Sequence, residues 1–124
     1  MFDALKGMAG LGGLMKDLPR IRQRLDRARS ELADMTVEAN AGGGAVTAVA
    51  DGRMRIRSVK VDPAMLSTLV DVADGNAQRM AEDLITSAVN AALERAQQMI
   101  SDHLKEAAAE LGIPLPPGGI PGLL

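Results

Sequence analysis

The feature that most constrains the fold of this chain is an Asp-Pro step between a strand pattern and a helical pattern. The run reads Val61-Asp62-Pro63-Ala64-Met65-Leu66, and a small-residue-rich helical stretch from Glu82 to Leu93 follows about twenty residues later. Proline has no N–H to donate to a β-ladder, so the strand must end there. The chain is therefore expected to change from sheet to helix after residue 62.

A heptad-spaced helix is predicted over residues 16–35. Its apolar residues alternate between spacings of three and four, as in a coiled-coil seam: Leu18, Ile21, Leu25, Ala28, Leu32 and Met35. Asp17 is the expected N-cap, and Pro19 then falls in the first turn, where its missing N–H has no intrahelical partner to lose.

The apolar period then changes from about 3.6 to two, which predicts strands at residues 36–41 and 45–50 around a glycine turn at 42–44. Asp51-Gly52 predicts a two-residue hairpin turn. In the third strand, Met54 and Ile56 are expected to face inward, with Arg53, Arg55 and Arg57 outward. Val59 and Val61 are at odd-numbered positions, whereas Met54 and Ile56 are at even-numbered ones. For all four apolar side chains to face inward the alternation must shift once, so a bulge is expected near Ser58.

A final helix is predicted to begin after Asp74 as N-cap and to end at Gly112. Residues 64–72 connect it to the sheet, with one helical turn at Met65-Leu66. A helix of this length exceeds a compact body of this size, so it should project or pack along a second chain. The expected class is α+β, with the order α-β-β-β-α and a three-stranded antiparallel sheet.

Three segments are expected along the chain. Residues 1–15 form a flexible Gly-rich arm, residues 16–111 a single domain, and residues 112–124 a flexible Pro/Gly-rich tail. Phe2 is the only aromatic residue, so the core must consist of aliphatic residues and methionine. A body this small and poor in large side chains favours dimerisation.

Charge is distributed unevenly. Residues 1–60 hold 11 Lys/Arg and 7 Asp/Glu, whereas residues 61–124 hold 3 Lys/Arg and 9 Asp/Glu. A chain with a net charge of −2 can thus present a positive face. There is no cysteine and no apolar stretch of membrane-spanning length, so we expect a cytoplasmic protein with no membrane partner.

Two sets of arginines are candidates for phosphate contact. The first lies on the predicted first helix, with Arg20, Arg24 and Arg27 in one row and Arg22 and Arg29 in another. The second set is Arg53, Arg55 and Arg57. The alternatives are a solvated helix flank paired with acids of the acidic last helix, and the solvent face of a half-exposed sheet.

Residue content argues against other chemistry. The near absence of aromatics disfavours single-strand and RNA-recognition surfaces, which stack bases, so duplex DNA is the better candidate. His103 is the only histidine, is expected on the surface or in a helix seam, and has no cysteine or second histidine to share a metal. We expect no enzyme activity, cofactor, metal or small-molecule substrate.

The ordered set of motifs resembles the YbaB/EbfC family of bacterial nucleoid-associated proteins. The residues that carry the resemblance are Gly13-Leu14-Met15-Lys16, Val59 to Leu66, Asp83 to Ala92, and Leu115 to Gly122. The resemblance implies an intertwined, tweezer-like homodimer that binds DNA in the nucleoid. It also implies that the basic positions of the first helix contact DNA: Lys16, Arg20, Arg22, Arg24, Arg27 and Arg29.

The expected function is therefore homodimeric binding of double-stranded DNA through arginine–phosphate contacts, with little sequence preference and effects on nucleoid organisation and gene expression. The alternative is a protein–protein scaffold or chaperone-like adaptor that holds a partner with the heptad helix and the long last helix.

Overall fold

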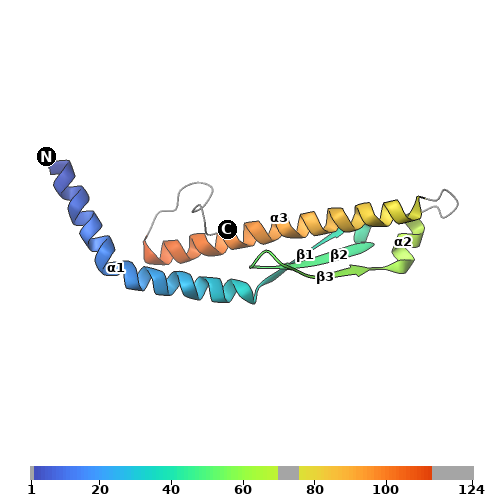
Figure 1. The fold of residues 1–124 in the computed structure, drawn as a ribbon, viewed down its shortest axis with the longest axis horizontal. Helices are drawn as coiled ribbons and strands as arrows, with labels where there is room; N and C mark the ends of the chain where they lie inside the picture. Colours follow the sequence, from blue (N-terminus) through green and yellow to red (C-terminus); the bar gives the residue numbers. More distant parts are fainter. Residues whose placement is uncertain (1, 70–75, 113–124) are drawn as a thin grey trace.

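The structure, a computed structural model, describes residues 2–69 and 76–112. Along the chain its elements are α1 (Phe2–Ala33), β1 (Thr36–Ala41), the 3₁₀ turn η1 (Gly42–Gly44), β2 (Val46–Asp51), β3 (Ile56–Val61), α2 (Pro63–Leu69) and α3 (Ala77–Leu111). Figure 1 shows an elongated molecule with the sheet beside one half of α3. The predicted α+β class and the α-β-β-β-α order are confirmed, with the short α2 added.

The sheet is antiparallel, in the order β1-β2-β3. Val49 pairs with Ser58, but the next residue, Ala50, pairs with Ile56, so Arg57 is the extra residue of a bulge. The bulge predicted near Ser58 is therefore confirmed. It shifts the alternation of side chains between the two ends of β3.

Small side chains pack α3 onto the sheet. Ala88, Ala92 and Ala96 of α3 are fully buried against one face, where they meet Ala48 of β2 and Ala39 of β1. Alanine lets a helix axis approach a sheet closely, because its side chain ends at Cβ. This packing explains how a chain almost without aromatic residues builds a dry core.

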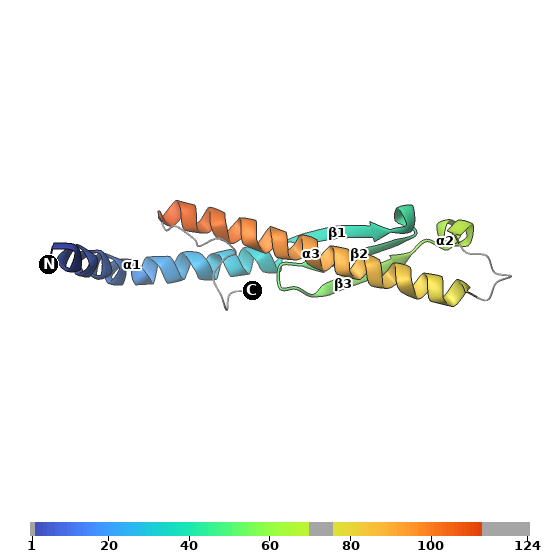
Figure 2. The same cartoon turned by 90° about the horizontal axis from the view of Figure 1, so that it is seen from above.

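The second half of α3 packs against α1, with which it runs antiparallel (Figures 1 and 2). The buried residues of this seam are Ala28 and Leu32 of α1 and Ile100, Leu104 and Ala107 of α3. The heptad prediction holds for these α1 positions, whereas Leu18 is 51% exposed. Within one chain the sheet and α1 together flank the length of the last helix, so the predicted projection is not seen, whereas packing along a second chain stays a prediction.

The first helix begins earlier than predicted. Its backbone is helical from Phe2, so Asp17 is no N-cap and Pro19 lies inside the helix. An interior proline removes the hydrogen bond to the residue four positions earlier and crowds that turn, which bends a helix without always ending it. Figure 1 shows such a bend, beyond which α1 leaves the end of α3. Flexibility of residues 1–15 stays a prediction.

The Asp-Pro step ends β3 as predicted and also starts a helix. The Asp62 carboxylate accepts the N–H groups of Ala64 and Met65 at 3.0 and 3.2 Å, which makes Asp62 the N-cap of α2. This helix is longer than the single turn predicted. At the other end of the domain, Gly112 caps α3 in the left-handed conformation, as predicted. Asp74 and the tail 113–124 lie outside the described residues.

The β2–β3 turn, residues 52–55, is longer than the two-residue hairpin turn predicted. The Asp51 N–H donates to the carbonyl of Arg55 at 2.9 Å, and β3 starts only at Ile56. Met54 has a φ of +63°, an unusual value for a residue with a side chain. The prediction that strand 53–57 presents its three arginines on one face is therefore wrong, because Arg53 and Arg55 lie in the turn.

Gly52 should be intolerant of any side chain. A Cβ there would overlap the carbonyl group of Leu32, at the end of α1. We expect Gly52→Ala to lower the free energy of unfolding by about 1–3 kcal/mol, the usual cost of overpacking, measured by urea denaturation. The control is Gly43→Ala, where a Cβ meets nothing within 4 Å and only a positive φ opposes it. Equal losses from both variants would contradict this close approach.

Candidate nucleic-acid interface

The seam with α3 divides the arginines of α1 between two flanks. Ala28 is fully buried in the seam, and successive helical residues are about 100° apart, so Arg27 and Arg29 lie on opposite sides of it. Arg24, Glu31 and Arg20 lie three, four and seven residues from Arg27, so they share its side of the helix. We call Arg20, Arg24, Arg27 and Glu31 the paired flank, and Arg22 with Arg29 the open flank.

Two of the three arginines of the paired flank, Arg20 and Arg24, are engaged with acids, whereas Arg27 is exposed and makes no ion pair with a described residue. The Nε of Arg24 donates to Glu110 of α3 at 2.6 Å, and its Nη1 lies 3.7 Å from Glu31. The Arg24 side chain is only 15% exposed. The hydrogen bond to Glu110 raises the pKa of Arg24 against the opposing effect of desolvation, and the same bond lowers the pKa of Glu110. For Arg24, the alternative of pairing with the acidic last helix is the one observed.

Two further contacts complete the paired flank. His103 of α3 lies with its Nε2 2.7 Å from a carboxylate oxygen of Glu31, so the histidine belongs to the helix seam, one of the two places predicted. Arg20 pairs with Asp17 at 3.8 Å in an exposed position. A ligand phosphate would have to compete with carboxylates already present on this side of α1.

In the described structure the arginines of the open flank are not engaged with acids, although the exposed Asp26 lies on the same side of α1, four residues after Arg22 and three before Arg29. Arg22 and Arg29 are exposed, and neither makes an ion pair with a residue that the structure describes. His103 and Lys105 lie on opposite sides of the buried Leu104, so Lys105 falls on the open side of α3. The open flank therefore gathers positive charge from both helices.

The β2–β3 turn is organised by a buried carboxylate. Asp51 is 2% exposed, and its Oδ1 accepts the N–H groups of Arg53 and Arg55 at 2.8 and 3.1 Å. Its Oδ2 accepts the Nε of Arg57 at 2.8 Å. Burial by itself would raise the pKa of Asp51, but these three donors together lower it below its usual range. Sequence reasoning missed this role for Asp51.

The three arginines predicted on the third strand differ in their contacts. Arg57 binds Asp51 and also donates its Nη2 to the carbonyl of Ala33 at 2.9 Å, which ties β3 to the end of α1. Arg53 and Arg55 are exposed and unpaired within the described part of the chain. The predicted set of Arg53, Arg55 and Arg57 is thus split by the structure.

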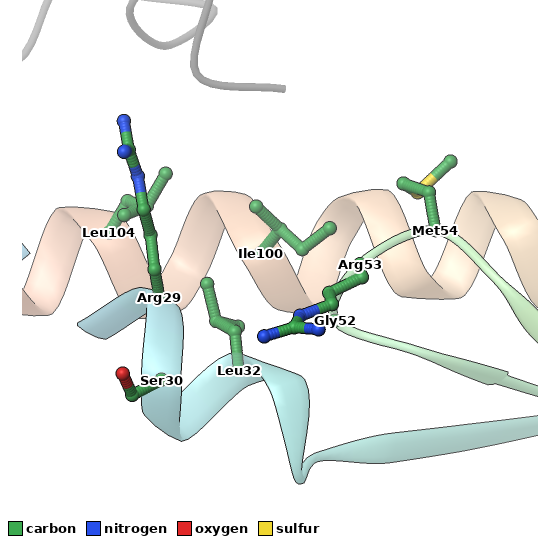
Figure 3. Close-up of a pocket in the computed structure, with 8 residues that line it drawn as sticks. All are labelled: Arg29, Ser30, Leu32, Gly52, Arg53, Met54, Ile100 and Leu104. Carbon is green, nitrogen blue, oxygen red and sulfur yellow. The ribbon is translucent and has the colours of Figure 1, made fainter. Parts of the chain in front are cut away.

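Arg29 and Arg53 both line a pocket of about 330 Å³, shown in Figure 3. Its floor is apolar, with Leu32 of α1 and Ile100 and Leu104 of α3. Arg29 extends beside Leu104, and Arg53 extends from the turn toward Leu32. Lys16, the remaining predicted contact, lies on the helical backbone of α1.

Neither a metal centre nor a membrane span is found in the described ranges. Residues 2–69 and 76–112 contain no group of three or more His, Cys, Asp or Glu side chains that could hold a metal ion. No described helix is both long and apolar enough to cross a membrane.

Most of the chain is similar to proteins of one known family. Residues 8–111 match the model of the YbaB/EbfC DNA-binding family. A nucleoid-associated protein of Acetivibrio thermocellus is 38% identical over 121 residues, covering 94% of this chain and 96% of that protein. One from Pelotomaculum thermopropionicum is 40% identical over 101 residues, with coverages of 82% and 90%.

The fold also occurs among solved structures. An uncharacterized protein from Helicobacter pylori superposes with a TM-score of 0.51 at 15% sequence identity. The match covers 76% of this chain and 96% of that one. At this identity the likeness concerns the fold alone.

The Arg24–Glu110 pair should contribute stability that depends on pH. Because the folded state lowers the pKa of Glu110, the stabilisation is complete above the unfolded value of about 4.3 and is lost as pH falls through the folded value. We expect Glu110→Gln to lower Tm at pH 7, and this difference from the wild type should shrink as the pH is lowered below about 4.3. Glu106→Gln is the control, because no ion pair to Glu106 is found among the described residues. A Tm difference independent of pH would contradict the pairing.

Proposed function

The chain belongs to the YbaB/EbfC DNA-binding family, and on that premise we propose that it binds double-stranded DNA as a homodimer within the bacterial nucleoid. Contact is from arginine to phosphate, with little sequence preference, and the bound protein affects nucleoid organisation and gene expression. The observation that carries the proposal is the open flank, whose two arginines are exposed and make no ion pair with any residue that the structure describes.

The chemistry of the open flank suits a duplex backbone. A guanidinium group is planar and can form two parallel hydrogen bonds with phosphate oxygens. Arg22 and Arg29 are seven residues apart, or about 10 Å at 1.5 Å per residue, so both can contact one extended polyanion. Asn and Gln side chains read adenine in the major groove, and Gln23 is the only amide side chain in α1. The surface therefore supports binding that is mainly independent of sequence.

An uncovered apolar edge supports the homodimer. Val59 and Val61 of β3 pair with Ala48 and Val46, whose side chains are buried beneath α3, so all four lie on the helix-facing side of the sheet. Yet Val59 and Val61 remain 39% and 41% exposed. Exposed apolar side chains on an unpaired edge strand favour association. A second copy would cover them and would double each row of arginines.

The same apolar edge is compatible with the alternative function, a protein–protein scaffold. In that case the exposed valines would receive a different protein, and the arginines of α1 would serve solubility or partner choice. The two functions differ in their response to DNA, since only the first requires salt-dependent affinity for a duplex.

Duplex binding should depend steeply on salt and on the open flank. We expect fluorescence anisotropy to show affinity that falls with rising salt, and Arg22→Ala/Arg29→Ala to reduce the log–log salt slope by about 2 for each protomer in contact. Arg22→Lys/Arg29→Lys keeps the charge and should keep most of the slope. Arg20→Ala, on the paired flank, should change the slope less.

Two results would count against the proposal. The absence of duplex binding by the wild-type protein at low salt would favour the scaffold function. Binding that the Ala pair leaves unchanged would remove the open flank from the interface.

The β3 edge should control the oligomeric state. We expect Val59→Asp/Val61→Asp to convert a dimer to a monomer in sedimentation experiments, because burying two carboxylates against a second copy is strongly unfavourable. Lys60→Asp is the matched control, since Lys60 lies on the opposite face of the same strand, paired with Thr47. A dimer that survives the Val pair, or is lost equally in the control, would place the interface elsewhere.

A further inference from the structure

The pocket between α1, the β2–β3 turn and α3 joins two cationic elements that are distant in sequence. Arg29 comes from the last turns of α1, and Arg53 comes from the turn. Both side chains are exposed, and both line the same hollow of about 330 Å³ (Figure 3). Figure 3 shows the two side chains pointing in different directions, so an anion that contacts both must extend across the hollow.

The nearest acid of the turn is not free to serve as that anion. In the described structure, Asp51 accepts hydrogen bonds from the turn and the start of β3. The donors are the N–H groups of Arg53 and Arg55 and the Nε of Arg57. The Asp51 carboxylate is buried, and its negative charge is stabilised by these three donors. Among the residues that the structure describes, no Asp or Glu lines the pocket. An external anion would therefore meet two guanidinium groups without a competing carboxylate in the lining.

The turn is held firmly against α1. The N–H of Gly52 donates to the carbonyl of Met35 at 3.1 Å, and Arg57 donates to the carbonyl of Ala33 at 2.9 Å. Gly52 approaches Leu32 so closely that a Cβ would overlap it. These contacts fix the backbone of Arg53 relative to α1, so the fold sets the separation of the Arg29 and Arg53 backbones, from which the two exposed side chains extend.

The pocket also continues the open flank. Arg22 precedes Arg29 by two helical turns on the same side of α1, and the pocket begins where that row ends. A compact anion would use the pocket alone, whereas a row of cations leading into it suits an extended polyanion. The apolar floor of Leu32, Ile100 and Leu104 lowers the local dielectric constant, which strengthens attraction between guanidinium and phosphate.

We propose that the backbone of bound duplex DNA crosses this pocket, contacted from α1 by Arg29 and from the β2–β3 turn by Arg53, with Asp51 as the residue that positions the turn for this contact. The inference rests on the proposed DNA-binding function and adds a second contact element to it. Arg55, on the same turn, does not line this pocket and takes no part.

The first experiment compares single variants in duplex binding, by anisotropy at fixed low salt. Arg53→Ala should lower affinity about as much as Arg29→Ala, roughly tenfold for a charged hydrogen bond, and should reduce the salt slope by about 1. Arg55→Ala, the matched control on the same turn, should stay within about twofold. If Arg29→Ala weakens binding and Arg53→Ala does not, the pocket proposal is wrong and the DNA-binding function stands. If the wild type does not bind, both fail.

The second experiment separates the positioning role of Asp51 from general stability. Both backbone N–H groups of the turn bind Oδ1, so Asp51→Asn retains an acceptor for them and should keep most of the affinity. Asp51→Ala should lose as much affinity as Arg53→Ala, and the double variant Asp51→Ala/Arg53→Ala should lose no more. An additive double variant would show that Asp51 acts elsewhere. Should Asp51→Ala fail to fold, full affinity in Arg53→Ala would still overturn the proposal.

Discussion

The apolar seam between α1 and α3 determines which arginines of this protein are free to bind a ligand. Burial of Ala28 and Leu32 against Ile100 and Leu104 fixes the rotation of α1 about its own axis. That rotation turns Arg24 toward Glu110 and leaves Arg22 and Arg29 in solvent. A helix with the same arginines but a seam shifted by one residue would expose a different set. The electrostatics of the surface thus follow from packing inside the molecule.

The seam has a second consequence through the β2–β3 turn. Ala33 at the end of α1 and Met35 just after it provide carbonyl groups, which accept hydrogen bonds from Arg57 of β3 and from Gly52 of the turn. Asp51 holds the turn in shape by accepting three hydrogen bonds. The arginines of α1 and those of the turn are therefore connected by hydrogen bonds as well as by apolar contact. The alanine-rich face of α3 packs against both the sheet and α1, without aromatic side chains in either contact.

Much of this architecture could be predicted from local sequence patterns. The first strand had the predicted bounds, and the stop at Asp62-Pro63 and the C-cap at Gly112 were also correct, because each depends on residues close together in sequence. The heptad positions identified which side of α1 is buried. They could not identify the paired flank, since Arg24 and Glu110 are 86 positions apart. Placing the turn required knowing that the side chain of Asp51 would capture the N–H groups of Arg53 and Arg55, which replaced the two-residue hairpin suggested by Asp51-Gly52.

The most direct test of the division between the flanks is to observe the arginine side chains themselves during binding. In a ¹⁵N NMR titration of the full-length protein with duplex DNA, each Nε–H group reports on its own environment. If the seam determines which arginines bind DNA, the Nε signals of Arg22, Arg29 and Arg53 should be perturbed. The signal of Arg24 should not change, because its Nε remains bound to Glu110. Perturbation confined to Arg20, Arg24 and Arg27 would contradict the account, because DNA would then bind the flank that carries the acids.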